Sequence, residues 1–193
     1  MPSNQDMRNR LREIIKTKSY QFGNEFTLAS GKRSRHYFNM KPTMLDPEGA
    51  YLIANLVLDE VEKIGQQFDA IGGLELGAIP IASAVAPLSH IRDTPINAFI
   101  IRKKAKDHGT KSLIEGLPKG QTLKDKSIVI LEDVTTTGGS AIKAIQAVRE
   151  EGAKVEHAIT ILDREEGARQ AFAAIGINLI NILSKSDFKQ SDT

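Results

Sequence analysis

Apolar and polar positions follow two alternating periods along most of this chain. Short apolar runs, typical of buried strands, cover residues 68–72, 96–101, 127–131, 155–162 and 177–183. Between these runs, apolar positions recur every three or four residues, which predicts helices over residues 79–90, 139–151 and 165–174. Strands that alternate with helices form parallel sheets. We therefore predict an α/β fold with a doubly wound, mainly parallel five-stranded sheet flanked by helices.

The first quarter of the chain has a different pattern. An amphipathic helix is predicted over residues 8–18, and residues 20–45 mix aromatic residues with turn residues. That mixture is typical of a small subdomain packed as a hood over a core. A further helix is predicted over residues 47–64, after an Asp-Pro pair that suits a helix start. Because no linker, repeat or low-complexity segment interrupts the pattern, we expect one domain over residues 1–193.

The composition narrows the class of protein. The absence of cysteine excludes disulfides, thiolate metal sites and cysteine nucleophiles, and the four histidines show no metal-ligand spacing. A net charge of +2 with 5% aromatic residues disfavours a nucleic-acid surface. The apolar runs are too short to span a membrane, and the N-terminus lacks the apolar core of a secretory signal. We expect a cytoplasmic protein without a metal site of its own.

The segment after the strand at 127–131 carries candidate chemistry. Two adjacent carboxylates, Glu132 and Asp133, are followed by hydroxyl side chains and two glycines, and then by a helix. The free N–H groups and the dipole of a helix start favour an anion, hydroxyls donate to phosphate oxygens, and carboxylates accept from sugar hydroxyls. An ordinary capped turn is the simpler alternative, but it leaves the mutual repulsion of the two carboxylates without a use. The order therefore predicts a site for a phosphorylated sugar. The chain has no Walker or dinucleotide-binding glycine motif.

A cationic stretch precedes that strand. Residues 102–117 form a long connection that begins Arg102-Lys103-Lys104-Ala105-Lys106-Asp107-His108-Gly109. Long connections inside compact domains are often active-site lids, so we predict a flexible catalytic loop here. An arginine fork, mobile lysines and a histidine that titrates near neutral pH all suit a diphosphate. Ligands of parallel sheets bind at the carboxyl ends of the strands, where this loop, the acidic pair and Asp163-Arg164 would meet.

These motifs resemble a known family. The stretch from Glu132 to Ser140 resembles the phosphoribosyl diphosphate (PRPP) signature of type I phosphoribosyltransferases. Arg102-Lys103-x-x-Lys106-x-His108-Gly109 resembles the catalytic loop of the orotate phosphoribosyltransferase family. Three further motifs resemble that family in order and spacing: Phe26-Thr-Leu-x-Ser-Gly31, Tyr37-Phe38-Asn39 and Leu162-Asp163-Arg164-Glu165-Glu166-Gly167. The resemblance covers roughly residues 20–170.

The resemblance implies an enzyme that transfers the 5-phosphoribosyl group from PRPP to orotate, giving orotidine 5-phosphate and diphosphate in pyrimidine (UMP) biosynthesis. Mg²⁺ would arrive with PRPP. The implied PRPP ligands are Arg102, Lys103, Lys106, His108, Glu132, Asp133, Val134, Thr135, Thr136, Thr137, Gly138, Gly139 and Ser140. Among them, catalysis would fall to Lys103, Lys106, His108 and Asp133. Orotate would contact Thr136, Arg164, Tyr37 and Phe38. A homodimer is implied, in which the loop Arg102–Gly109 reaches the neighbouring active site.

Two positions depart from the family pattern. Many relatives carry lysines where this chain has Ala29 and Gly77, so those phosphate contacts are not carried over. Main-chain N–H groups around Gly77, with Lys32 or Arg33, are the alternative diphosphate ligands.

Two other functions are compatible with the phosphosugar loop. A phosphoribosyltransferase for another base shares the phosphosugar loop, although the cationic loop and Arg164 favour orotate. A PRPP-sensing regulator without catalysis needs a DNA-binding segment, and the sequence offers none.

Overall fold

The computed structural model describes residues 2–27, 33–104 and 113–188. Its main sheet has the strand order β5-β4-β3-β6-β7-β8, and every neighbouring pair is parallel except β4 with β5. The strands are β3 (Ala70–Leu74), β4 (Asn97–Ile101), β5 (Ile114–Glu115), β6 (Ser127–Thr135), β7 (Lys154–Asp163) and β8 (Asn178–Ser184). The predicted α/β fold with a mainly parallel sheet is confirmed. The sequence pattern missed β5, because two residues are too few to give a periodic signal.

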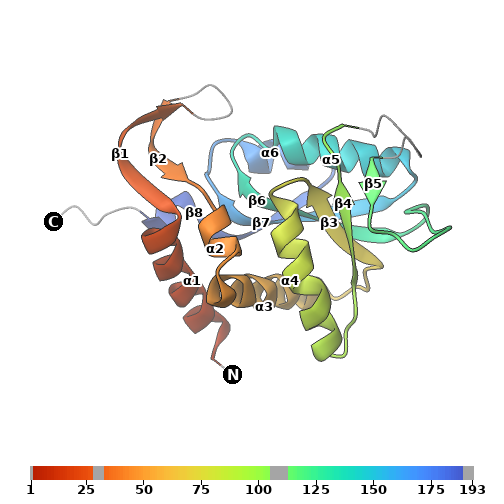
Figure 1. Ribbon diagram of the computed structural model, residues 1–193. Coiled ribbons are helices and arrows are strands. Elements are labelled where there is room, and N and C mark those ends of the chain that lie inside the picture. The colour runs from red at the N-terminus through yellow and green to blue at the C-terminus, as the bar shows by residue number, and fades with distance from the viewer. Residues whose placement is uncertain (1, 28–32, 105–112, 189–193) are drawn as a thin grey trace.

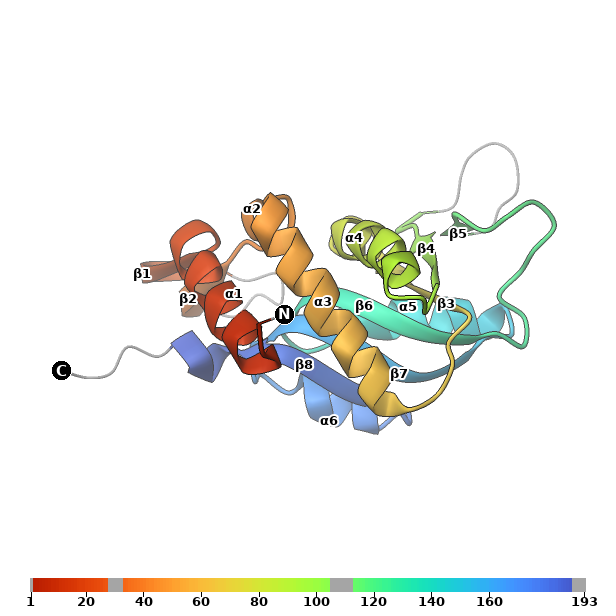
Figure 2. The same cartoon turned by 90° about the horizontal axis from the view of Figure 1, so that it is seen from below.

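Helices cover both faces of this sheet. Figure 2 shows α1 (Asn4–Lys18), α3 (Pro47–Ile64) and α4 (Ala78–Ile91) on one side and α6 (Ala168–Ala173) on the other. The remaining long helix, α5 (Gly139–Glu150), shares its buried cluster with α6. Helix α1 begins four residues before the predicted start because Ser3 and Asp6 form a capping box. None of the helices in the described residues is both long and apolar enough to cross a bilayer.

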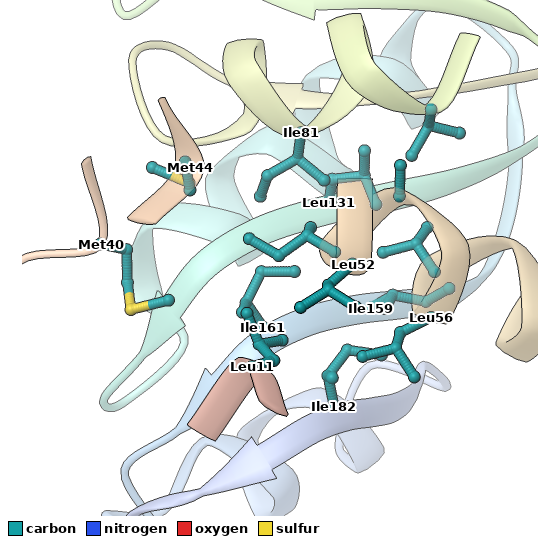
Figure 3. Packing of buried hydrophobic residues seen from close by; sticks show 14 of the residues in the cluster. Leu11, Met40, Met44, Leu52, Leu56, Ile81, Leu131, Ile159, Ile161 and Ile182 are labelled. Atoms are coloured by element: carbon teal, nitrogen blue, oxygen red, sulfur yellow. The ribbon is translucent and has the colours of Figure 1, made fainter. Parts of the chain in front are cut away.

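The core follows from the alternation of side chains along the strands. On β6, Val129 and Leu131 face the cluster under α1, α3 and α4, whereas Ile128 and Ile130 face α5 and α6. Figure 3 shows leucines of α3 and Ile81 of α4 packed around Leu131. Each fully buried side chain of this size contributes about 1.5–3 kcal/mol relative to an exposed one. Burial on both faces therefore fixes the register of the central strands.

A second, two-stranded sheet lies beside the main one. It pairs β1 (Tyr20–Thr27) antiparallel with β2 (Arg33–Phe38) and is followed by the short helix α2 (Lys41–Met44). In Figure 1 the two strands stand at the left, above α1. The ring of Phe38 lies 4.9 Å from that of Tyr20 and 5.2 Å from that of Phe188, in the 3₁₀ helix Lys185–Phe188. This aromatic cluster attaches the predicted hood region to the end of the main domain.

The strand order reverses direction between β3 and β6. Strand β4 lies on one side of β3 and β6 on the other, and parallel sheets bind their ligands at such a switch point, beyond the carboxyl ends of the strands. Pairing with β3 ends at Gly72 and Ile130, but β6 continues to Thr135 along β7. The strand predicted over residues 127–131 is therefore four residues shorter than β6 in the structure. Continued pairing with β7 holds the acidic residues inside a strand, and their other edge is not paired with β3.

Candidate active site

The acidic pair lies in the unpaired stretch of β6 beyond β3. Glu132 is partly buried, and its Oε2 atom is buried without a hydrogen-bond partner among the described residues. Burial and the neighbouring carboxylate of Asp133 raise the pKa of Glu132 to about 8, whereas the positive charge of Lys103 lowers it. Hydroxyl donors or a cation at this position would favour the ionised form. The pair is therefore suited to a ligand that brings such groups.

The turn after β3 packs directly on Asp133. A Cβ atom added to Gly77 would lie 2.6 Å from Oδ1 of Asp133, so any side chain at residue 77 requires Asp133 to move. The same Oδ1 atom accepts a hydrogen bond of 2.9 Å from the main-chain N–H of Val134. The glycine that departs from the family pattern thus allows the turn to lie against the acidic pair.

The turn that connects β6 to α5 is suited to bind an anion. Gly138 caps α5 in the left-handed region with φ of 82°, and no side chain caps the first N–H groups of the helix. These N–H groups and the helix dipole attract negative charge. A pocket of about 330 Å³ lies here. It is lined by Glu132, Val134, Thr135, Thr136, Thr137, Gly138, Gly139, Ser140, Ala141 and Lys143.

The predicted hydroxyl ligands fall into two groups. Thr135 is buried, and its hydroxyl donates to the carbonyl of Leu162 and to Oδ1 of Asp163, each at 3.4 Å. Its side chain therefore joins β6 to β7. Thr136, Thr137 and Ser140 are more exposed and line the pocket, where their hydroxyls are available to an anion.

Lys143 was missed by the sequence reasoning, although it lines the same pocket. It lies one helical turn after Gly139, the first residue of α5. That spacing places a cation beside the helix start and is the signal that could have identified it.

Arg102, the first residue of the predicted cationic loop, is held through both its main chain and its side chain. The N–H of Arg102 donates to the carbonyl of Leu113 at 2.9 Å, and its guanidinium donates to Glu115 at 3.2 Å. Lys103 is exposed, and its charge acts on Glu132. Lys106 and His108 lie outside the described residues.

Arg164 follows β7 and is almost fully buried, with 3% of its surface exposed. The main-chain N–H of Arg164 donates to the carbonyl of Thr135 at 2.9 Å, which places Arg164 beside the turn between β6 and α5. Its guanidinium donates to Oε1 of Glu166 at 3.0 Å, to the carbonyl of His36 at 3.1 Å and to Oγ of Ser34 at 3.0 Å. Three of its five N–H groups are thus used, and strand β2 of the hood region is joined to the main sheet.

Ser34 and Glu166 were not among the predicted site residues. Ser34 stands between two arginines in the sequence and looks like part of an exposed cationic strand. Glu166 belongs to the Asp163-Arg164-Glu165-Glu166 motif, and its spacing of two residues from Arg164 was an available signal. Both became visible only through their contacts with the guanidinium.

The two aromatic residues predicted to cover orotate lie on opposite faces of β2. Phe38 is buried and belongs to the aromatic cluster with Tyr20 and Phe188. Tyr37 is 37% exposed, and its ring stacks on that of Phe26 at 5.1 Å. Neighbouring residues of a strand point in opposite directions, so the two rings cannot lie on the same side of a ligand.

A larger pocket of about 790 Å³ lies away from all of these residues. It is lined by the ends of α3 and α4 and by residues just before β3 and β4, at the amino ends of these strands. Since ligands of parallel sheets bind at the carboxyl ends of the strands, the smaller pocket is the better candidate for the ligand site.

Metal chemistry at this site depends on the acidic pair. Within residues 2–27, 33–104 and 113–188, no three His, Asp or Glu side chains gather as a metal cage. Glu132 and Asp133 nevertheless supply two carboxylates, and the buried Oε2 atom of Glu132 has no partner among the described residues, which fits a Mg²⁺ ion that is held mainly by a substrate.

Comparison with known proteins agrees with this geometry. Residues 43–184 match the family described as phosphoribosyl transferase domain. The orotate phosphoribosyltransferase of Bradyrhizobium diazoefficiens is 54% identical over 181 residues, which are 94% of this chain and 95% of the relative. A crystal structure of Mycobacterium tuberculosis orotate phosphoribosyltransferase in complex with Fe(III) dicitrate has a TM-score of 0.80 and 33% identity, covering 95% of this chain and 99% of that one. The chain belongs to the orotate phosphoribosyltransferase family.

A second structure shows what a family member binds. The Mycobacterium tuberculosis orotate phosphoribosyltransferase in complex with PRPP has a TM-score of 0.75 and 30% identity, over 94% of this chain and 98% of that one. Membership in the orotate phosphoribosyltransferase family confirms the predicted resemblance. It also argues against the two alternatives, a phosphoribosyltransferase for another base and a regulator without catalysis.

Proposed function

We propose that this chain transfers the 5-phosphoribosyl group of PRPP to orotate, with Mg²⁺ supplied with PRPP. The observation that carries the proposal is the acidic pair of β6 beside the uncapped start of α5, with the buried Arg164 hydrogen-bonded to Thr135, which lies between them in the sequence. The first two features suit a phosphorylated sugar, and the guanidinium suits a planar pyrimidine acid. Family membership supports the same reaction.

The sugar phosphate would lie between β6 and α5. The 5-phosphate would accept hydrogen bonds from the main chain at Gly138 and Gly139 and from the hydroxyls that line the pocket. Glu132 and Asp133 would accept hydrogen bonds from the ribose hydroxyls, which offsets the burial of Glu132. Lys143 adds positive charge to this end of the site.

Orotate would bind on the hood side. Arg164 has two N–H groups beyond the three used by Ser34, His36 and Glu166, enough for a bidentate contact with a carboxylate. Thr136 lies in the adjacent turn. Tyr37 is the more exposed of the two aromatic residues, which favours it over Phe38 as the residue that covers the ring.

The reaction would break the bond between the anomeric carbon and diphosphate and form the bond to the ring nitrogen of orotate, with inversion. No covalent nucleophile is needed, so the chain's task is to hold two substrates in line and to stabilise the departing charge. Lys103, Lys106 and His108 would stabilise the diphosphate from the cationic loop. Magnesium would supply further neutralisation of that charge.

We further propose a homodimer in which the loop Arg102–Gly109 reaches the neighbouring active site. The described ends of the cationic stretch, Arg102 and Leu113, directly follow β4 and precede β5, and β5 is the edge strand of the sheet in the described residues. A loop at a sheet edge can extend toward a second copy of the chain. The cytoplasmic location predicted from the sequence stays a prediction.

A direct assay tests the function. The purified chain is incubated with PRPP, magnesium and orotate while the loss of orotate absorbance is followed, and adenine, hypoxanthine and uracil compete in parallel. We expect turnover of orotate that none of the other bases suppresses strongly. Turnover of a different base would overturn the specificity, and binding of PRPP by calorimetry without turnover would indicate a PRPP sensor.

A further inference from the structure

Glu75 makes two contacts with the chain that leaves β4. It is the first residue after β3, and its N–H donates to the carbonyl of Ile101 at 2.8 Å. Its side chain extends further in the same direction, and Oε1 accepts a hydrogen bond of 2.9 Å from the N–H of Lys103. One residue thus holds both the last residue of β4 and the first lysine of the cationic loop.

The opposite side of the same stretch is held by β5. Arg102 donates its N–H to Leu113, and Ile101 pairs with Ile114. Arg102 is therefore fixed by the main chain of Leu113, the residue before β5, whereas the described contact of the Lys103 main chain is made by a side chain. The position of Lys103 depends on Glu75 in a way that the position of Arg102 does not.

The negative charge of Glu75 has two opposite effects at this position. The turn 75–77 places Gly77 against Asp133, and its main-chain N–H groups are the alternative diphosphate ligands expected from the sequence, so a carboxylate in this turn would repel that ligand. A hydrogen bond from an N–H to a carboxylate is about twice as strong as one between neutral groups, so the acidic side chain is a strong anchor. The repulsion is the cost of that anchor.

We propose that Glu75 is a positioning residue that fixes the main chain of Lys103 and so sets the direction in which its ammonium group extends. The proposal rests on the proposed function, because it assigns Lys103 a role in the reaction. It predicts that an acceptor atom at residue 75 matters more than a negative charge. Glutamine keeps a carbonyl oxygen near the position of Oε1, whereas alanine removes the acceptor.

The test compares Glu75→Ala with Glu75→Gln by steady-state kinetics and by amide hydrogen exchange at Lys103. We expect Glu75→Ala to lower kcat about tenfold with little change in the KM for orotate, and to speed exchange at Lys103. Glu75→Gln should keep kcat within about twofold of the parent and keep slow exchange. Glu62→Ala, an exposed position at the far end of α3, is the control for the loss of one negative charge.

A double-mutant cycle separates positioning from a structural role. If Glu75 acts through Lys103, adding Glu75→Ala to Lys103→Ala lowers kcat no further, and the melting temperatures of all variants stay close to the parent. Full additivity, parental exchange in Glu75→Ala, or equal loss in Glu75→Gln would each overturn the inference. If the parent itself lacked turnover, the proposed function would fail, and the exchange rates alone would still decide whether Glu75 anchors Lys103.

Discussion

At the level of one residue, the buried carboxyl group of Glu132 lowers the stability of the folded chain but suits a cationic or hydroxyl-rich ligand. A carboxyl group that is buried beside a second carboxylate disfavours its own charged form, and one of its oxygens has no partner among the described residues. A side chain kept in such an environment is typical of a binding site rather than of a core. The same residue is therefore expected to trade stability for ligand binding.

Glu132→Gln tests this trade as a function of pH. In the folded chain the pKa of Glu132 is about 8, whereas the ordinary pKa of a glutamate carboxyl is 4.5. Between these values the folded state binds more protons than the unfolded state, so the stability of the parent falls as the pH rises from about 4.5 to about 8. Glutamine does not titrate. We therefore expect the melting temperature of Glu132→Gln, relative to the parent, to rise across this window while PRPP affinity falls. A difference that is constant with pH would contradict the assignment.

At the level of elements, the anion site is a property of the connection between β6 and α5. Gly138 adopts φ of 82° where the chain turns into the helix, and a Cβ atom there would lie 2.5 Å from a ring carbon of Phe172 in α6. Phe172 is fully buried, so it has little room to move. The packing of α6 thus sets the shape of a turn that the proposed function uses for phosphate.

Gly138→Ala is expected to destabilise the fold and to weaken PRPP binding together. A non-glycine residue in such a backbone conformation costs about 1–3 kcal/mol, and the contact with Phe172 adds to that. Urea denaturation measures the loss, and calorimetry measures PRPP affinity. Gly176→Ala is the matched control, because Gly176 has φ of 72° but no atom near its added Cβ. If the two variants lost equal stability, the contact with Phe172 would be unimportant.

At the level of the whole molecule, the site depends on segments that are distant in the sequence. The turn after β3 lies against Asp133, the start of α5 follows β6, and Arg164 joins β7 to the hood strand β2. The switch in strand order between β3 and β6 brings these parts to the carboxyl ends of the same strands. The proposed dimer adds a further segment, the cationic loop of a second copy.

Mixing two inactive variants tests whether the loop serves the neighbouring site. Lys103→Ala and Asp133→Asn are each expected to lose most turnover while keeping the parental melting temperature. If Lys103 acts in the neighbouring site, random exchange of subunits between the two variants restores about a quarter of the parental activity, because one site in each mixed dimer is intact. In the described chain the charge of Lys103 also acts on its own Glu132. An absence of recovery would therefore assign Lys103 to its own chain.

Much of the fold and part of the site could be predicted from local pattern. The apolar runs and helix periods located the five long strands and the flanking helices, because burial on one or two faces determines the period of the sequence. The acidic pair and the glycine turn were recognisable because their residues are contiguous. The length of β6 could not be predicted from the local pattern. Its last residues are polar and belong to the strand because they pair with β7.

The sequence by itself determined the sheet class, the glycine turn before α5 and the family, since each depends on neighbouring residues or on motifs in a fixed order. Only the tertiary structure decided that Thr135 faces β7, that Tyr37 and Phe38 point apart, and that Ser34 and Glu166 hold Arg164. The same is true of the contact between Glu75 and Lys103, which are separated by 28 residues. Such contacts arise from the pairing and twist of strands, and no local pattern along the chain encodes which distant side chains that pairing brings within hydrogen-bond distance.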